Sequence, residues 1–150
     1  MQARMTHPIQ VQPDAMKALM ALSKAANDST VPATTHHLIH VRVSQINGCS
    51  VCVDMHSREM KEAGEKDERI WAVGAWRESP YFTDAERAAL DLAEHVTRLA
   101  DRSDPVPDEV WDAAADIYDE KELSSLLLSI AGINVWNRLN AAIRQPVGSF

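Results

Sequence analysis

Apolar side chains recur at helical spacing along nearly the whole chain, and no series of alternating strands with hairpin turns interrupts them. Short polar or proline-marked breaks separate the helical stretches, which begin near residues 13, 33, 49, 66, 84, 108 and 120. This pattern predicts an all-α bundle of about six to seven helices. Because 150 residues is close to the commonest size of a domain, we expect a single domain over residues 1–150.

The stretch from Ala33 to Asn47 is the most ambiguous of these predicted helices. Val41, Val43 and Ile46 are β-branched, which favours a strand. However, Ile39, Val43 and Ile46 follow the i, i+4, i+7 spacing of one helical face. We therefore predict a helix here.

Two segments carry the residues of helix N-terminal caps. Thr83 and Glu86 have the spacing of a capping box, in which each side chain bonds the backbone N–H of the other residue. The acidic run at 119–122 has the character of a second cap, ahead of the predicted last helix at about 120–143.

The last predicted helix is apolar almost all round between Leu123 and Trp136, which indicates burial on several sides. Either another subunit covers part of it, or it occupies a central position within the monomer. A polar stripe of Asn134, Asn137 and Asn140 runs along the same helix. We expect these amides to be hydrogen-bonded, either in an interface or across the helix that carries the cysteines.

The charge balance and the apolar runs exclude several classes of protein. Fifteen Lys and Arg against 22 Asp and Glu give a net charge of −7, and no basic run offers a site for nucleic acid or an anionic membrane surface. The longest apolar run, 126–133, is far shorter than the roughly 20 residues that span a bilayer. The N-terminal residues lack the apolar stretch of a signal peptide, and two cysteines cannot form a disulfide scaffold. We expect a cytoplasmic protein.

The chemically distinctive feature is the trio Cys49, Cys52 and His56. On a helix the three side chains lie within about 60° of one another, since each residue turns by about 100°. Cys52, at i, i+4 from His56, is well placed to give its proton to the imidazole, whereas Cys49 lies nearer the positive end of the helix dipole. The two effects favour different thiols, so the residue pattern leaves the attacking cysteine open. Attack on a peroxide would give a sulfenic acid, which the other cysteine converts to a disulfide.

The stretch Val43–His56 places Asn-Gly before the paired cysteines and a histidine after them. It resembles the signature of the AhpD-like branch of the carboxymuconolactone decarboxylase family, an all-helical group of thiol-dependent alkylhydroperoxidases. Residues 76–80, 83–93 and 133–138 resemble the same family, so the similarity extends from about Ile9 to Pro146.

The resemblance implies roles for four residues. Cys52 would attack the peroxide, Cys49 would resolve the sulfenic acid to a disulfide, and His56 would relay the proton. The relay of the family also uses a glutamate twelve residues before the first cysteine, where this chain has His37. His37 is thus a candidate catalytic residue as a substitute base or hydrogen-bond partner. Because an imidazole adds no negative charge to orient His56, we expect weaker peroxidase activity than in glutamate-bearing relatives.

The resemblance also implies partners. The protein would act as a homo-oligomer, trimeric or hexameric, on a hydroperoxide substrate, with no metal or organic cofactor. An external thiol reductant would reopen the disulfide, and in the best-known members this partner resembles a lipoyl-bearing protein. We expect no nucleic acid or membrane partner.

Metal binding is the main alternative function. Cysteine and histidine together suit zinc, although a Cys-x-x-Cys pair on a continuous helix differs from the turn of most structural zinc sites. The potential ligands are His36, His37, His40, Cys49, Cys52 and His56.

Several other interpretations of the cysteine pair compete with peroxide reduction. The pair could serve a redox sensor or a general dithiol oxidoreductase without significant peroxidase turnover. Lactone decarboxylation has no use for a dithiol, and thioredoxin-like exchange needs βαβ units that this sequence lacks. Finally, the cysteines could be inert core residues, since free cysteine is often buried.

Overall fold

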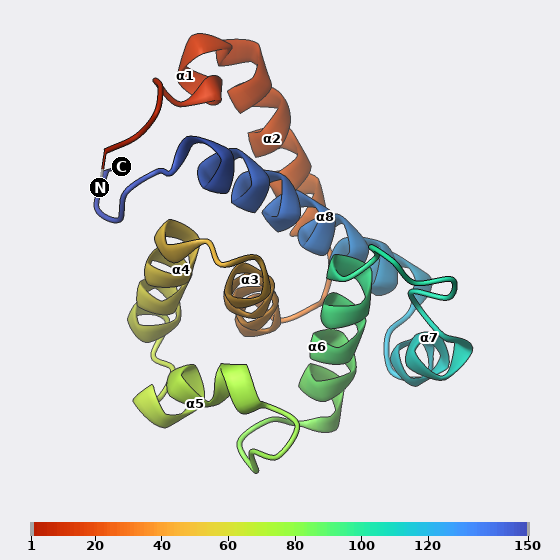
Figure 1. Ribbon diagram of the computed structural model, residues 1–150. Helices are drawn as coiled ribbons and strands as arrows, with labels where there is room; N and C mark the ends of the chain where they lie inside the picture. Colours follow the sequence, from red (N-terminus) through yellow and green to blue (C-terminus); the bar gives the residue numbers. More distant parts are fainter. Residues whose placement is uncertain (1, 150) are drawn as a thin grey trace.

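The computed structural model describes residues 2–149, and every regular element within that range is helical (Figure 1). The all-α prediction is therefore confirmed. The α-helices of this range are α1 (Pro8–Val11), α2 (Pro13–Ala26), α3 (Ala33–Asn47), α4 (Ser50–Glu62), α5 (Asp67–Ala72), α6 (Asp84–Thr97), α7 (Asp108–Ala115) and α8 (Glu120–Ile143), and a 3-10 helix, η1 (Val73–Ala75), follows α5.

Three helix boundaries differ from the sequence prediction. The short helix α1 precedes the first predicted one, and the ring of His7 accepts a hydrogen bond from Ile9 N at its start. The segment predicted as one helix over 66–76 divides into α5, which ends at Ala72, and η1, which contains Gly74, a residue of low helix propensity. The helix predicted near 108–118 ends at Ala115.

Capping boxes begin the two helices for which the sequence predicted caps. At α6, Glu86 N donates to Thr83 Oγ1 at 3.2 Å and Thr83 N donates to Glu86 Oε2 at 2.9 Å. At α8, Asp119 and Glu122 exchange the same two bonds at 2.8 and 3.0 Å. Each box satisfies backbone donors that the first turn of a helix leaves without partners.

Helix α8 occupies a central position within the chain (Figure 1). It packs against α2 on one side and against α3 and α6 on another. Leu126 and Ile130 are fully buried along it, whereas Leu128 and Val135 keep more than a third of their surface exposed. Neighbouring helices of the same chain thus explain most of its apolar character. None of the helices within residues 2–149 is long and apolar enough to cross a membrane.

Helix α3 is buried on opposite faces, because it packs against α4, α6 and α8. Ile39 and Val43 belong to one hydrophobic cluster with residues of α6, α7 and α8. Leu38 and Val41 belong to a second cluster under α5 and η1. Its β-branched residues therefore fill the core from a helix, as predicted. This double packing fixes the position of the histidines that α3 carries beside α4 and α8.

Candidate active site

Only Gly48 and Cys49 join α3 to α4, so the backbone makes a sharp turn at the first cysteine. Gly48 has φ 67°, a left-handed conformation that glycine adopts without a steric penalty. Cys49 N then donates to Ser44 O at 3.0 Å. Cys49 is the N-cap residue of α4 and Cys52 lies in its first turn. Both thiols are therefore placed at the positive end of the α4 dipole.

The two thiols are free, buried and hydrogen-bonded to each other. The hydrogen bond from Cys52 lowers the pKa of Cys49 to about 6, although burial opposes this shift. The same hydrogen bond, followed by burial, raises the pKa of Cys52 well above its usual range. The pair thus shares one proton at neutral pH, with the first negative charge on Cys49. The sequence leaves open which of the two thiols loses its proton first. The electrostatics favour Cys49 as the first thiolate.

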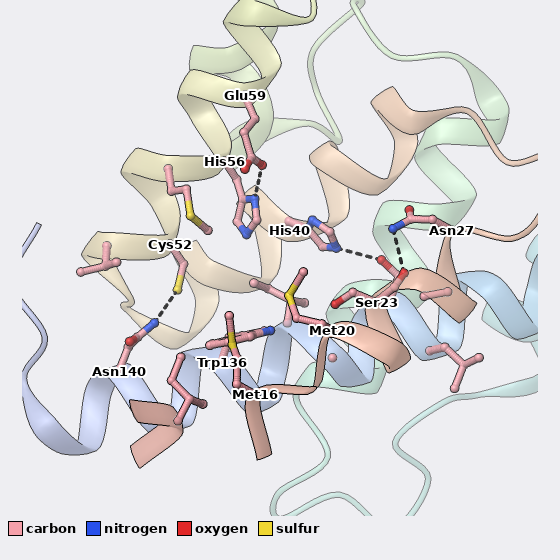
Figure 2. A pocket seen from close by; sticks show the side chains of 18 residues that line it. Met16, Met20, Ser23, Asn27, His40, Cys52, His56, Glu59, Trp136 and Asn140 are labelled. Carbon is pink, nitrogen blue, oxygen red and sulfur yellow. Dashed lines mark hydrogen bonds and ion pairs between the residues drawn. The ribbon is translucent and has the colours of Figure 1, made fainter. Parts of the chain in front are cut away.

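The asparagine stripe of α8 faces the turn between α3 and α4. Asn140 Nδ2 donates to Cys52 Sγ at 3.2 Å (Figure 2), and this bond lowers the pKa of both thiols. Asn47 Nδ2 donates to the side-chain oxygens of Asn134 and Asn137, both at 2.9 Å. The predicted hydrogen bonding of the stripe is confirmed, and it runs across to the cysteine-bearing turn within one chain.

His56 lies one turn beyond Cys52 on α4 and is held by a carboxylate. Its Nδ1 lies 2.7 Å from Glu59 Oε2, and the hydrogen bond lowers the pKa of Glu59 (Figure 2). His37 Nδ1, from α3, lies 3.6 Å from the same carboxylate oxygen. The structure thus joins His37 to His56 through Glu59. Sequence reasoning missed Glu59, although its i, i+3 spacing from His56 is a signal that could have identified it.

Two further histidines of α3 share one hydroxyl of α8. His36 Nδ1 and His40 Nε2 lie 3.0 and 2.9 Å from Ser129 Oγ. The His40 ring packs against that of His56, with 4.6 Å between their centroids. Burial, followed by the proximity of His56, lowers the pKa of His40 well below its ordinary value. His40 is therefore neutral at physiological pH.

A cavity of about 460 Å³ opens over Cys52, between residues of α2, α4 and α8 (Figure 2). Cys49 does not line it. A small polar side next to Cys52 is formed by His40, His56, Glu59 and Asn140. The remaining wall is largely apolar, and its large side chains are Ile9, Met16, Met20, Met55, Leu128, Ile133 and Trp136. A substrate in this cavity would meet Cys52 first.

Only some of the potential metal ligands come together in the described part of the structure. One ligand atom from each of His37, His40 and His56 lies within 4.8 Å of the others. The two thiols and His36 do not belong to this group. A mixed cysteine and histidine metal site is therefore not what the fold assembles from these residues.

Comparisons with known proteins agree with the fold. The model of the carboxymuconolactone decarboxylase family matches residues 13–95. The uncharacterized protein YdfG of Bacillus subtilis (strain 168) is 39% identical over 140 residues, which cover 93% of this chain and 94% of YdfG.

Two solved structures are similar over most of the chain. A protein of unknown function from Agrobacterium tumefaciens, a candidate antioxidant defence protein AhpD, is 33% identical with a TM-score of 0.90, and the match covers 99% of this chain and 100% of that one. The debrominase Bmp8 has a TM-score of 0.82 at 24% identity, over 94% of this chain and 75% of its own, which shows a shared fold alone. This chain belongs to the carboxymuconolactone decarboxylase family, in its AhpD-like branch.

Proposed function

We propose that the protein is a thiol-dependent hydroperoxide reductase in which Cys52 attacks the peroxide and Cys49 resolves the product. The observation that carries this proposal is the position of Cys52. Its sulfur borders a largely apolar cavity and is hydrogen-bonded both to a second thiol and to Asn140. The apolar wall suits the organic part of an alkyl hydroperoxide, and the polar side suits its peroxide group.

The reaction begins with the proton that the two thiols share. When this proton moves from Cys52 to Cys49, the N–H of Asn140 stabilises the charge on Cys52. The Cys52 thiolate attacks the terminal peroxide oxygen, so that an S–O bond forms and the O–O bond breaks. The leaving alkoxide takes a proton from His56 and departs as the alcohol.

Resolution then forms the disulfide. Cys49 attacks the sulfenic sulfur of Cys52, and the hydroxide that leaves combines with the Cys49 proton as water. His56 recovers its proton from solvent. An external dithiol reopens the disulfide by exchange and is itself oxidised. No metal or organic cofactor takes part in these steps.

Glu59 supports the proton relay through His56. Its carboxylate lies 2.7 Å from His56 Nδ1, so it orients the ring. The negative charge that position 37 lacks is thus supplied from α4. The sequence suggested weak activity because it placed no carboxylate beside His56. The contact with Glu59 removes that reason.

Peroxide consumption by the wild type, Cys49→Ser and Cys52→Ser tests the proposal, with dihydrolipoamide as reductant and a dimedone-type reagent as a trap. We expect turnover in the wild type only, and a trapped sulfenic acid in Cys49→Ser at Cys52. A trapped sulfenic acid in Cys52→Ser alone would exchange the two roles. Disulfide formation in the wild type without repeated turnover would contradict the reductase and favour a redox sensor.

We also propose that the protein is a homo-oligomer. Met20 of α2, Val135 of α8 and Trp71 of α5 keep 54%, 38% and 76% of their surface exposed. Large apolar side chains at these levels of exposure favour a contact with further copies of the chain. Light scattering after size exclusion measures the mass, and a monomer at micromolar concentration would contradict this proposal.

A further inference from the structure

Three histidines converge beside the cavity, and the proposed thiol chemistry uses only one of them as a proton relay. His37 and His40 stand at i, i+3 on α3, and His56 faces them from α4. One ligand atom of each ring lies within 4.8 Å of the others. His56 and Glu59 form a second i, i+3 pair, on α4. Facing helices that each present such a pair are a common way to build a metal site inside a helical bundle.

The surroundings leave ring nitrogens available for a ligand. Ser129 Oγ bonds His40 Nε2 at 2.9 Å, which fixes the ring and leaves Nδ1 for another partner. His37 Nδ1 is buried and has no hydrogen-bond partner in the described part of the chain. Glu59 Oε2 lies 3.6 Å from His37 Nδ1 and 2.7 Å from His56 Nδ1. A carboxylate oxygen is therefore adjacent to two of the three rings.

We propose that His37, His40 and His56 bind one divalent transition-metal ion of the zinc type, with Glu59 as the fourth ligand. Imidazole and carboxylate are ligands that zinc, iron and nickel accept, and three histidines with one carboxylate complete a tetrahedral set. An ion at about 2 Å from each nitrogen requires the rings to close by about an ångström. Binding would also give the buried His37 Nδ1 a partner.

This site differs from the mixed cysteine and histidine site that the sequence suggested. It contains no sulfur, and His36 is excluded because Ser129 and Ser125 hold its two nitrogens. The bound ion would occupy His56 and Glu59, so it would inhibit peroxide reduction. Only this last consequence rests on the proposed function; binding itself does not.

Zinc titration by calorimetry tests the site in a Cys49→Ser, Cys52→Ser double variant, in which thiols cannot bind the metal. We expect one equivalent to bind, and His37→Gln and His40→Gln each to weaken binding by roughly tenfold or more. His95→Gln, on α6 and far from the cluster in sequence, is the matched control and should bind as the parent does. Circular dichroism verifies that each variant is folded, and the His37 side chain, which is 25% exposed, tolerates glutamine better than a fully buried side chain would.

Cobalt binding provides a second readout. In the wild-type protein, tetrahedral cobalt with nitrogen and oxygen ligands should show visible bands without a thiolate charge-transfer band. Zinc binding that is lost in the cysteine double variant would overturn the proposal in favour of the thiols. Unchanged affinity in both His37→Gln and His40→Gln, or the absence of stoichiometric binding, would overturn it as well.

Discussion

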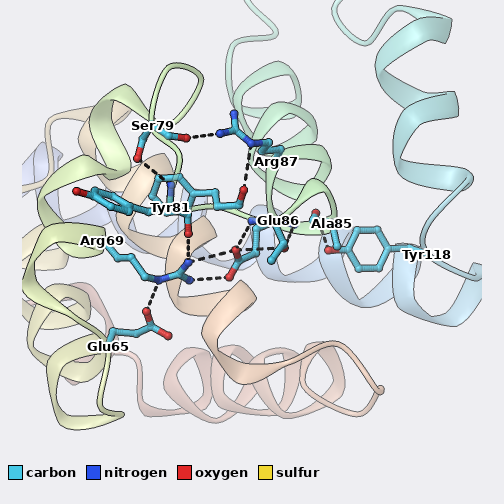
Figure 3. Close-up of polar contacts among 10 residues, drawn as sticks. Glu65, Arg69, Ser79, Tyr81, Ala85, Glu86, Arg87 and Tyr118 are labelled. Atoms are coloured by element: carbon cyan, nitrogen blue, oxygen red, sulfur yellow. Dashed lines mark hydrogen bonds and ion pairs between the residues drawn. The ribbon is translucent and has the colours of Figure 1, made fainter.

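Two groups of polar side chains in the interior of this protein differ in whether each charged or hydrogen-bonding group has a partner of its own. Around α6, several carboxylates meet arginines: Arg69 lies between Glu65 and Glu86, and Glu94 bonds Arg42 (Figure 3 shows the Arg69 part). We call these residues the α6 ionic network. Around the α3–α4 turn, the same kinds of groups share protons and border a cavity (Figure 2).

The difference distinguishes polar groups that stabilise the fold from polar groups that can take part in chemistry. In the α6 ionic network, every carboxylate has an arginine partner, and its role is to hold helices together. Around the thiols, two sulfurs share one proton, and one carboxylate oxygen lies 2.7 Å from the His56 ring and 3.6 Å from the His37 ring. A thiol pair that shares one proton, next to a cavity, is the kind of arrangement that chemistry at a site requires.

The largest effect is expected from breaking the α6 ionic network at Arg69. Arg69→Ala leaves the buried Glu86 and the half-buried Glu65 without their common partner, and should lower the free energy of unfolding by about 3 kcal/mol. Urea denaturation measures the change. The control is Arg58→Ala, which removes an exposed pair with Asp54 at the same helical spacing and should leave the unfolding midpoint nearly unchanged. Equal losses in the two variants would contradict the distinction.

Acid should weaken the same network through protonation of Glu94. Burial would raise the pKa of this carboxyl, but hydrogen bonds from Trp76 and Arg42 outweigh it and lower the pKa from 4.5 to about 2. Because the pKa is lower in the folded than in the unfolded state, the ionised carboxylate stabilises the fold at pH values above the unfolded-state pKa. This stabilisation is lost as the pH falls through the folded-state pKa. Between pH 4.5 and 2 the wild type should lose about 3 kcal/mol through Glu94. Glu94→Gln should lack this part of the loss, and identical acid profiles would contradict it.

At the thiols, the comparison predicts a titration near neutrality. Thiolate absorbance in the ultraviolet should rise with a midpoint near pH 6 in the wild type. In Cys52→Ala the hydrogen bond to Cys49 is absent, so the midpoint should rise toward the ordinary value of 9.0. Asn140→Ala should cause a smaller rise, because the amide is a lesser cause of the shift. An unchanged midpoint in Cys52→Ala would assign the low pKa to the helix dipole instead.

Local spacing was sufficient to predict most of the fold. The capping residues Thr83 and Asp119 mark helix starts because their bonds are made within one turn of the chain. The burial of α8 was predicted as well, but its cause was not. An apolar surface shows that something covers it, and only the packing of α2 and α3 shows that the same chain does so.

Helical spacing predicted the part of the candidate site that lies on a single helix. Cys52 and His56 share a face of α4 because helical spacing places them there. Which groups face α4 from α3 and α8 depends on the packing of those helices, so Asn140 was expected to bond somewhere but not to a sulfur. Glu59 was missed because the family resemblance directed attention to position 37 on α3, whereas the carboxylate comes from α4.

The smallest effect is expected from Glu59→Gln, which keeps the shape of the side chain and removes its charge. If Glu59 orients and charges His56, peroxide reduction should fall roughly tenfold, a part of the 10²–10⁴-fold that a proton relay contributes. Initial rates of peroxide consumption measure the change.

Asp54→Asn is the matched control for Glu59→Gln. It removes one carboxylate from the same helix, but Asp54 bonds Arg58 and does not line the cavity. A loss of activity in both variants would mean that net charge near α4, and not the contact with His56, controls the rate. If Glu59→Gln alone loses activity and His37→Gln has no effect, the relay carboxylate resides on α4, and the histidine at position 37 does not replace the glutamate of the family.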